Sequence, residues 1–292
     1  MYNQIDSNKR KSFLLILLFI VIIAGLVWVW DYYYGGNYVA VVFAFIFASV
    51  MSLVSFYAGD KLALAQSGGR EIAKQDNPYV WRLVENISIT AGVPMPKVYI
   101  IDDPAMNAFA TGRDPQHASI ALTSGIISGL ENEELEGVIA HELSHVKNYD
   151  IRLMMVVIVL IGIITLLADW LMRSFMWGRR SRDDRNSGSG ILIIIGLILA
   201  ILSPLFAKLI QLAVSRKREY LADASGALLT RYPEGLARAL EKIEAQNGRL
   251  LHANKATAHL YISNPFSAQS VSRLFSTHPP IKDRIKTLRQ MA

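Results

Sequence analysis

Two long stretches without a charged residue near the start of the chain, residues 13–30 and 38–58, constrain the fold most strongly. The first has 18 residues and the second has 21. A helix rises about 1.5 Å per residue, so the shorter stretch would reach about 27 Å, enough to cross the apolar core of a bilayer. A turn containing Gly35 and Gly36 joins them, and aromatic residues crowd around it, as is typical of a lipid–water boundary. The pair is predicted to form an antiparallel helical hairpin in a membrane.

A cleavable secretory signal is the alternative for residues 13–30. Its apolar core would have about 7–15 residues and would be followed by small residues suited to cleavage. Here the stretch is longer, and Asp31 followed by three tyrosines comes after it. These features favour a retained anchor.

Two further uncharged stretches, residues 153–168 and 191–207, predict a second hairpin with a polar loop at residues 178–190. They have 16 and 17 residues, the lower limit for a crossing, so a shallow or protein-buried hairpin stays an alternative. Composition agrees with a membrane protein. Hydrophobic residues make up 52% of the chain and charged residues 18%, compared with about 25% charged residues in soluble proteins.

Charge and cysteine content exclude several kinds of function. The net charge of +6 is no sign of nucleic-acid binding unless it clusters on one element, and in a membrane protein it more often sets orientation. The chain has no cysteine, which excludes disulfide scaffolds, thiolate nucleophiles and Cys-ligated metals. Any metal must therefore be bound by His, Asp and Glu.

The remaining segments are expected to form a domain beside the membrane. Asn77 and Pro78 are typical of a helix start, Gly92 of its end, and a second helix is predicted over residues 131–148. Short β-prone stretches predict a small sheet. The fold class is thus a mainly α integral-membrane protein, with four apolar helices in two hairpins and a juxtamembrane α+β domain, which the spacing of His141 and His145 indicates to be zincin-like. The predicted strands lie at residues 98–101, 108–111 and 119–123, and the expected units are residues 1–60 (first hairpin), 61–150 (catalytic domain, first part), 151–214 (second hairpin) and 215–292 (catalytic domain, second part).

One pentapeptide carries the chemistry, His141 to His145 with Glu142 directly after the first histidine. Residues four apart lie on one face of a helix, so both imidazoles can converge on one divalent ion while Glu142 reaches a water molecule beside it. The chance that this His-Glu-x-x-His pattern occurs at random somewhere in a chain of this composition is on the order of half a percent. The predicted helical setting favours a zinc site.

A hydrolytic zinc ion takes three protein ligands and keeps one position open. The third ligand could be one of the other histidines or one of the acidic residues. Glu219 is the strongest candidate, with Asp223 four residues further on the same helix face, where it could hold the second ring nitrogen of a ligating imidazole. An ordinary surface acid beside three basic residues is the alternative for Glu219. The remaining histidines are His117, His252, His259 and His278.

These residues resemble the HtpX family of heat-shock membrane metalloproteases, whose wider family includes the CAAX-prenyl endopeptidase. The resemblance covers essentially the whole chain and rests on residues 107–112, 138–145, 219–223 and 277–280, with Arg284 near the end. It implies one Zn²⁺ per chain bound by His141, His145 and Glu219, and Glu142 as catalytic acid and base. It also implies cleavage of damaged or misassembled membrane proteins on the cytoplasmic side. Glu131 departs from the pattern, since a Ser-type cap is expected before the zinc helix.

Topology gives an independent expectation. Between His145 and Glu219 lie 73 residues, nearly all of them in the third and fourth apolar stretches. Because zinc ligands meet within about 2 Å of one ion, this segment has to leave the site and return to the same side. Eleven basic residues flank that side and five lie in the loop between the last two stretches, which favours a cell membrane protein with a cytoplasmic site.

The expected mechanism assigns roles to the remaining residues. Glu142 would take the proton of the attacking water and pass it to the leaving amine. His278 is a candidate to stabilise the oxyanion, with capping or packing before Pro279 as the alternative. Arg284 could orient a carboxylate of the site or lie on a helix surface. An edge strand would pair with extended substrates, and a plain core strand is the alternative for its residues Asn107, Ala108, Phe109 and Ala110.

Three other functions fit the sequence less well. An intramembrane protease would place the acids at the start of the zinc helix in lipid, which is costly. A receptor with an inactive metal site predicts loss of the catalytic glutamate, and Glu142 is present. A soluble zinc peptidase with one anchor does not account for the additional apolar stretches. The prediction is an integral-membrane zinc endopeptidase acting on protein substrates, with no expectation for the oligomeric state.

Overall fold

The computed structural model describes residues 2–34, 39–157, 160, 216–246, 260–262 and 279–291. Most of the predicted second hairpin, its polar loop and three of the histidines considered above, His252, His259 and His278, lie outside these residues.

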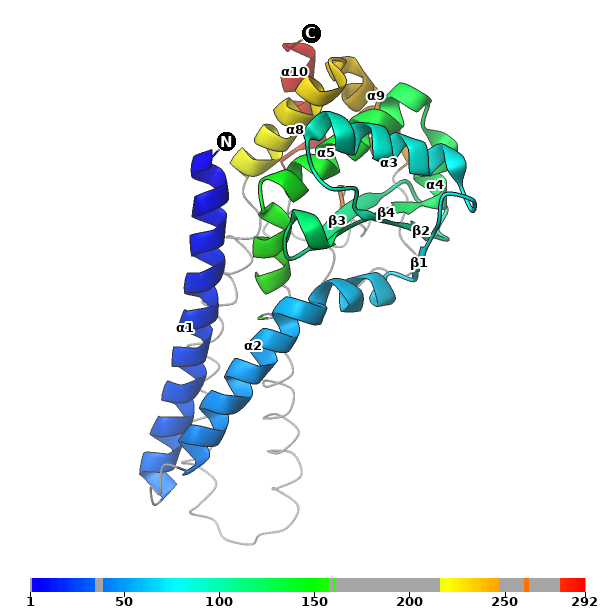
Figure 1. Ribbon diagram of the computed structural model, residues 1–292. Helices are drawn as coiled ribbons and strands as arrows, with labels where there is room; N and C mark the ends of the chain where they lie inside the picture. The colour runs from blue at the N-terminus through cyan, green and yellow to red at the C-terminus, as the bar shows by residue number, and fades with distance from the viewer. Residues whose placement is uncertain are drawn as a thin grey trace, which may run out of the picture.

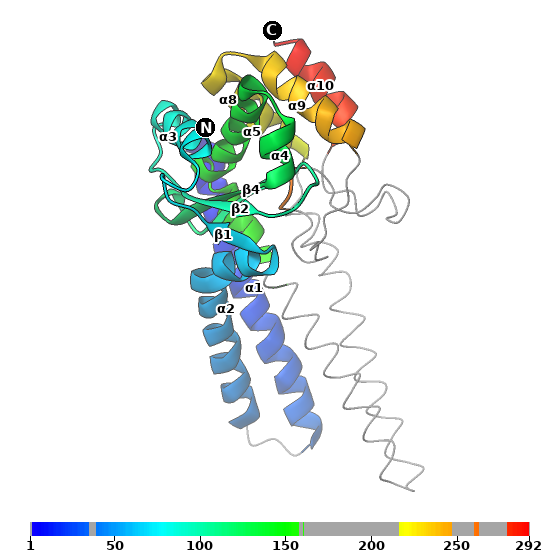
Figure 2. The same ribbon diagram turned by 90° about the vertical axis from the view of Figure 1, so that its right-hand side faces the viewer.

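Two long helices, α1 (Tyr2–Tyr34) and α2 (Val39–Gln66), run antiparallel and side by side, as predicted for the first hairpin (Figures 1 and 2). Large apolar side chains are exposed along both, for example Phe13 and Phe43, which are 66% and 69% exposed. Among the described residues, no single helix combines the length and hydropathy of a membrane span. Two consecutive segments, Val41–Val54 and Phe56–Gln66, meet both criteria together across a bend of 59°.

A mixed four-stranded sheet has the order β1-β2-β4-β3. The strands are β1 (Gly69–Glu71), β2 (Lys97–Ile101), β3 (Ala108–Gly112) and β4 (Ala118–Thr123). The β2–β4 pair is parallel and the two outer pairs are antiparallel. Three of these strands were predicted. Gly68 turns the chain between α2 and β1 with a positive φ of 70°, and Gly69 already pairs with Ile101.

The sheet is covered on both faces. Side chains at alternate positions of β3 and β4 enter a large apolar cluster with the helices, for example Ala108 and Ile120. Phe109 and Ala121 point into a second cluster with the end of α2 and with Tyr261. This two-sided burial explains why every residue of β3 and β4 is buried.

The helices of the catalytic part begin and end where local sequence predicts. Helix α3 (Pro78–Ala91) is capped by the Asn77 side chain and ends at Gly92 in the left-handed region. A short α4 (Ser124–Gly129) follows β4. Helix α5 (Asn132–Lys147) follows Glu131, whose N–H donates to the Glu134 carboxylate at 2.8 Å. Glu134 therefore satisfies this helix start although the Ser-type cap is missing.

Two C-terminal helices, α8 (Arg216–Thr230) and α9 (Pro233–Gln246), pack against α5. A third, α10 (Ile281–Arg289), packs against α8 and α9. Two glycines permit the close approach. A Cβ on Gly226 of α8 would lie 3.1 Å from the backbone nitrogen of His141, and one on Gly137 of α5 would lie 2.8 Å from the backbone of Leu236. These helices lie on one side of the sheet, and α1 extends past it to the level of α5 (Figure 2).

The prediction of a mainly helical chain with a small sheet is confirmed. The four-helix detail is not, because most of the second hairpin lies outside the described residues.

Candidate metal centre

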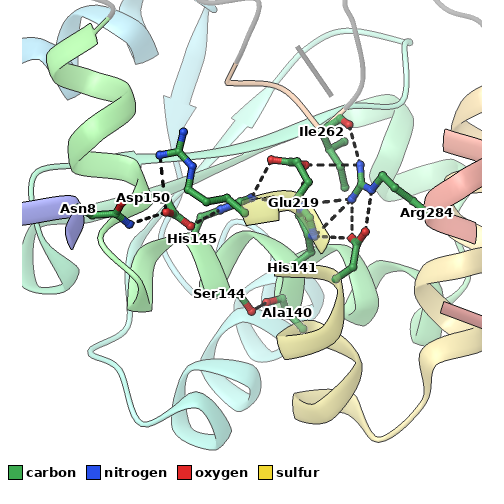
Figure 3. A network of polar contacts seen from close by, with 11 residues as sticks. Asn8, Ala140, His141, Ser144, His145, Asp150, Glu219, Ile262 and Arg284 are labelled. Carbon is green, nitrogen blue, oxygen red and sulfur yellow. Dashed lines mark hydrogen bonds and ion pairs between the residues drawn. The ribbon is translucent and has the colours of Figure 1, made fainter. Parts of the chain in front are cut away.

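Helix α5 places His141 and His145 one turn apart, with Glu142 beside them. All three are buried, at 1%, 5% and 2% exposed. The Nε2 atoms of the two imidazoles lie 3.3 Å apart. The apolar residues of α5 hold this part of the helix in the core, so the imidazoles occupy fixed positions (Figure 3).

Helix α8 brings Glu219 to the same point. Its Oε2 lies 3.8 Å from Nε2 of His141, and its Oε1 lies 3.6 Å from Nε2 of His145. One ligand atom from each of the three residues lies within 4.8 Å of the others. Ligands bound to zinc at about 2.0–2.1 Å in tetrahedral geometry are about 3.3–3.5 Å apart. The donor set therefore fits a zinc ion with little movement.

The second nitrogen of each ring is held by a carboxylate. Nδ1 of His141 lies 2.9 Å from Asp223 Oδ1, and Nδ1 of His145 lies 3.0 Å from Asp150 Oδ2. An ionised carboxylate only accepts, so each Nδ1 carries a proton. The proton on Nδ1 leaves Nε2 as the ring atom that can bind a cation, and the two Nε2 atoms face each other.

Arg284 secures the carboxylate behind His141. Its side chain is fully buried, and it donates from Nε and Nη2 to the two oxygens of Asp223 at 2.9 and 2.6 Å. Nη1 lies 3.7 Å from Glu219 Oε2. Of the two interpretations of Arg284, the surface position is thus excluded by its burial, and its guanidinium orients a carboxylate.

Asp150 was not identified from the sequence as part of the site. It follows the C-terminal residue of α5 by three positions, after Asn148 at the C-cap and Tyr149 at a positive φ of 59°. This turn directs Asp150 back toward His145, five residues earlier. An acid just beyond the helix end is the only sequence signal, and it is weak without the turn geometry.

The electrostatics of the site favour a positive charge between the ligands. Burial raises the pKa of Asp223, but the charge and hydrogen bonds of Arg284, helped by His141, outweigh it and lower the pKa to about 2. Burial lowers the pKa of His145, but the hydrogen bond to Asp150 and the charge of Glu219 outweigh it and raise the pKa to about 9. Surroundings that favour a proton on the ring equally favour a metal cation at Nε2.

Glu142 lies between the metal-binding group and the sheet. Burial raises the pKa of its carboxyl group, and the charge of Glu219 acts in the same direction. The two histidines and the backbone N–H of Ala110 in β3 oppose this rise. A raised pKa suits a residue that must both accept and return a proton near neutral pH.

Strand β3 is at the edge of the sheet, as expected for a substrate-binding strand. Its outer side is partly used within the described chain, because Ile262 donates its N–H to the Ala108 carbonyl at 2.9 Å. Asn107 precedes the strand and is bonded to Thr123 of β4. His278 lies outside the described residues, whereas His117 is on the surface, where its ring contacts Asp114.

The sequence pattern of residues 74–292 matches peptidase family M48. The chain belongs to this family. Among M48 relatives, a protease HtpX homolog of Dictyoglomus turgidum is 46% identical over 291 residues, covering 99% of this chain and 94% of the relative. A protease HtpX homolog of Tropheryma whipplei is 45% identical, covering 100% and 98%.

The fold is also similar to a solved structure, the crystal structure of S. mikatae Ste24p. The TM-score is 0.51 at 18% identity, and the match covers 99% of this chain and 67% of that chain. This likeness concerns the fold alone. As an M48 peptidase with HtpX relatives, the chain is a membrane-associated, zinc-dependent metalloendopeptidase.

Proposed function

We propose that the chain is a multi-pass protease of the cell membrane that hydrolyses misfolded or damaged membrane proteins on the cytoplasmic side. One observation supports the chemistry above all others. Two buried imidazoles of α5 and one buried carboxylate of α8 meet at separations of 3.3–3.8 Å, close to those around a zinc ion, next to a buried glutamate.

The membrane part of the proposal comprises two hairpins, residues 1–60 and 151–214. The first precedes the catalytic domain, and the second separates its two parts, residues 61–150 and 215–292. The exposed apolar side chains of α1 and α2 support the first hairpin. The excess of basic residues on the side of the site supports the cytoplasmic orientation.

In the proposed mechanism His141, His145 and Glu219 bind zinc. Zinc bound there supplies a Lewis acid, which acidifies water and polarises a carbonyl group. Glu142 takes the proton of the attacking water and returns it to the leaving amine. Asp223 and Arg284 hold the His141 ring, and His278 donates to the developing oxyanion.

The substrate is proposed to lie as an extended segment along the outer side of β3, where Asn107, Ala108, Phe109 and Ala110 contact it. Main-chain pairing does not discriminate between side chains, so it suits a protease that removes many different damaged proteins. Because Ile262 bonds Ala108 within the described chain, the substrate would pair with the edge beyond that bond.

Substitution of the catalytic glutamate tests the proposal. Glu142→Gln keeps the size of the side chain but removes the base, so cleavage of a fluorescently labelled unfolded membrane protein should fall by at least about 100-fold. Zinc content, measured by elemental analysis, should stay unchanged. Glu133→Gln, the same change at an exposed position of α5, is the control. Undiminished turnover by purified Glu142→Gln would refute the mechanism.

A further inference from the structure

The first helix contributes a side chain to the surroundings of the proposed metal centre. Asn8 of α1 is 1% exposed, although it lies in a helix whose apolar side chains are largely exposed. Its partners lie 140 and 142 residues away, in the turn that follows α5. Figure 3 shows Asn8 entering from α1 and pointing to Asp150, with His145 on the other side of that carboxylate.

The Asn8 amide is oriented by chemistry as well as by geometry. Nδ2 donates to the Asn148 carbonyl at 3.0 Å and to Asp150 Oδ1 at 2.7 Å. Both partners are acceptors, and only the nitrogen of the amide group can donate. The orientation of this side chain is therefore determined by its two bonds.

Asp150 connects Asn8 to the metal centre. One carboxylate oxygen accepts from Asn8 and the other contacts Nδ1 of His145. The nearest guanidinium nitrogen of Arg218 is 3.9 Å from Oδ1, beyond hydrogen-bond distance. Without Asn8 the buried carboxylate would lose its shortest hydrogen bond and its fixed rotation, and the ring orientation of His145 depends on that rotation.

A second contact joins α1 to the same turn. Lys9, the next residue of α1, places Nζ 4.4 Å from the centre of the Tyr149 ring. Tyr149 is the residue with positive φ that turns the chain so that Asp150 faces back to α5. Two consecutive residues of α1 thus contact the turn that carries Asp150.

We propose that Asn8 is a positioning residue of the metal centre: it holds Asp150, which holds the His145 ring in the orientation that presents Nε2 to zinc. The helix α1 would then be a required part of the catalytic domain as well as a membrane anchor. This inference rests on the proposed role of His145 as a zinc ligand.

Zinc affinity of the full-length chain in detergent, measured by competition with a fluorescent chelator, tests the inference. Asn8→Ala should weaken zinc binding by about 10-fold, the lower end of the effect of partners outside the ligands. Asn8→Leu keeps most of the packed volume without the donor and should give the same loss. The matched control is Ser12→Ala, since Ser12 is buried one turn further along α1 and bonds its own helix.

A double-mutant cycle separates positioning from a general effect on the fold. If Asn8 acts through Asp150, Asn8→Ala should cause little further loss in an Asp150→Asn background. The inference is overturned if Asn8→Leu binds zinc as tightly as Ser12→Ala, or if the loss is equally large in both backgrounds. Absence of zinc from the unaltered chain would instead overturn the proposed function, and this inference with it.

Discussion

The two imidazoles of α5 face the same point but are held from opposite ends of the chain. His141 is held by Asp223, which a buried arginine of α10 binds through two hydrogen bonds. His145 is held by Asp150, which accepts a hydrogen bond from the neutral amide of Asn8 in α1. We call these the C-terminal arm (His141, Asp223, Arg284) and the N-terminal arm (His145, Asp150, Asn8).

The arms differ in how the carboxylate charge is balanced. In the C-terminal arm a guanidinium neutralises Asp223 directly, which keeps that carboxylate ionised despite its burial. In the N-terminal arm the amide of Asn8 brings no charge, and the buried Arg218 guanidinium is more distant, at 3.9 Å from Asp150. The hydrogen bond and the charge of Asp150, with the charge of Glu219, outweigh the burial of His145 and raise its pKa to about 9. The comparison teaches that one arm stabilises the fold through an ion pair and the other mainly orients a ligand. Disruption should therefore lower zinc affinity in both arms, but lower stability mainly in the first.

The largest expected effect follows from breaking the C-terminal arm. Arg284→Met leaves the buried Asp223 carboxylate without its cation, and removal of one partner of a buried ion pair lowers the free energy of unfolding by about 3–5 kcal/mol. Chemical denaturation of the zinc-free chain in detergent measures this change in the free energy of unfolding. Arg289→Met, on the same helix, removes only exposed ion pairs and should change stability little. Equal changes in the two variants would show that Arg284 contributes no more than a surface arginine.

A smaller effect, loss of zinc affinity, should be shared by the two arms, which then differ in the stability of the zinc-free chain. Asp150→Asn and Asp223→Asn should each weaken zinc binding by about 10–100-fold, because each removes a carboxylate that orients a ligand. Asp223→Asn should also destabilise the zinc-free chain more strongly, because it removes the ionised acceptor of both short hydrogen bonds of Arg284, whereas the Arg218 guanidinium is 3.9 Å from Asp150. Chelator competition and denaturation on the same samples give both quantities. The comparison fails if Asp150→Asn destabilises the chain as much as Asp223→Asn.

The smallest expected effect is on stability and comes from an exposed carboxylate, Glu71, which lies outside both arms. Hydrogen bonds from Lys97 and then Tyr99 lower the pKa of Glu71 at the sheet edge. Because the pKa of Glu71 is lowered in the folded chain, its ionised carboxylate stabilises the fold at pH values above its ordinary pKa of 4.5. This stabilisation is lost as the pH falls through the lowered pKa. Solvent screening limits the contribution to about 1 kcal/mol or less. Glu71→Gln should therefore reduce stability slightly at pH 7 and not at pH 2, as denaturation curves at both pH values would show.

Much of this architecture follows from local sequence. The helix with the two histidines is predicted by their spacing and by the apolar residues beside them, and the caps of α3 are predicted by Asn77 and Gly92. Glu219 could be only a candidate, because its approach to α5 depends on the packing of α8 around Gly226.

The N-terminal arm could not be predicted in the same way. Asn8 and Asp150 lie 142 residues apart, and neither has a pattern that points to the other. Their contact depends on where α1 lies beside α5 and on the positive φ of Tyr149. Such long-range pairs arise from tertiary packing, which periodicity and spacing do not describe.

The zinc content of the purified full-length chain and of Glu219→Ala tests the central claim most directly. The account predicts one zinc ion per chain, largely lost in Glu219→Ala and retained in Glu244→Ala, the same change at an exposed position of α9. Full zinc occupancy in Glu219→Ala after dialysis against a chelator would contradict it, because the ion would then have other ligands.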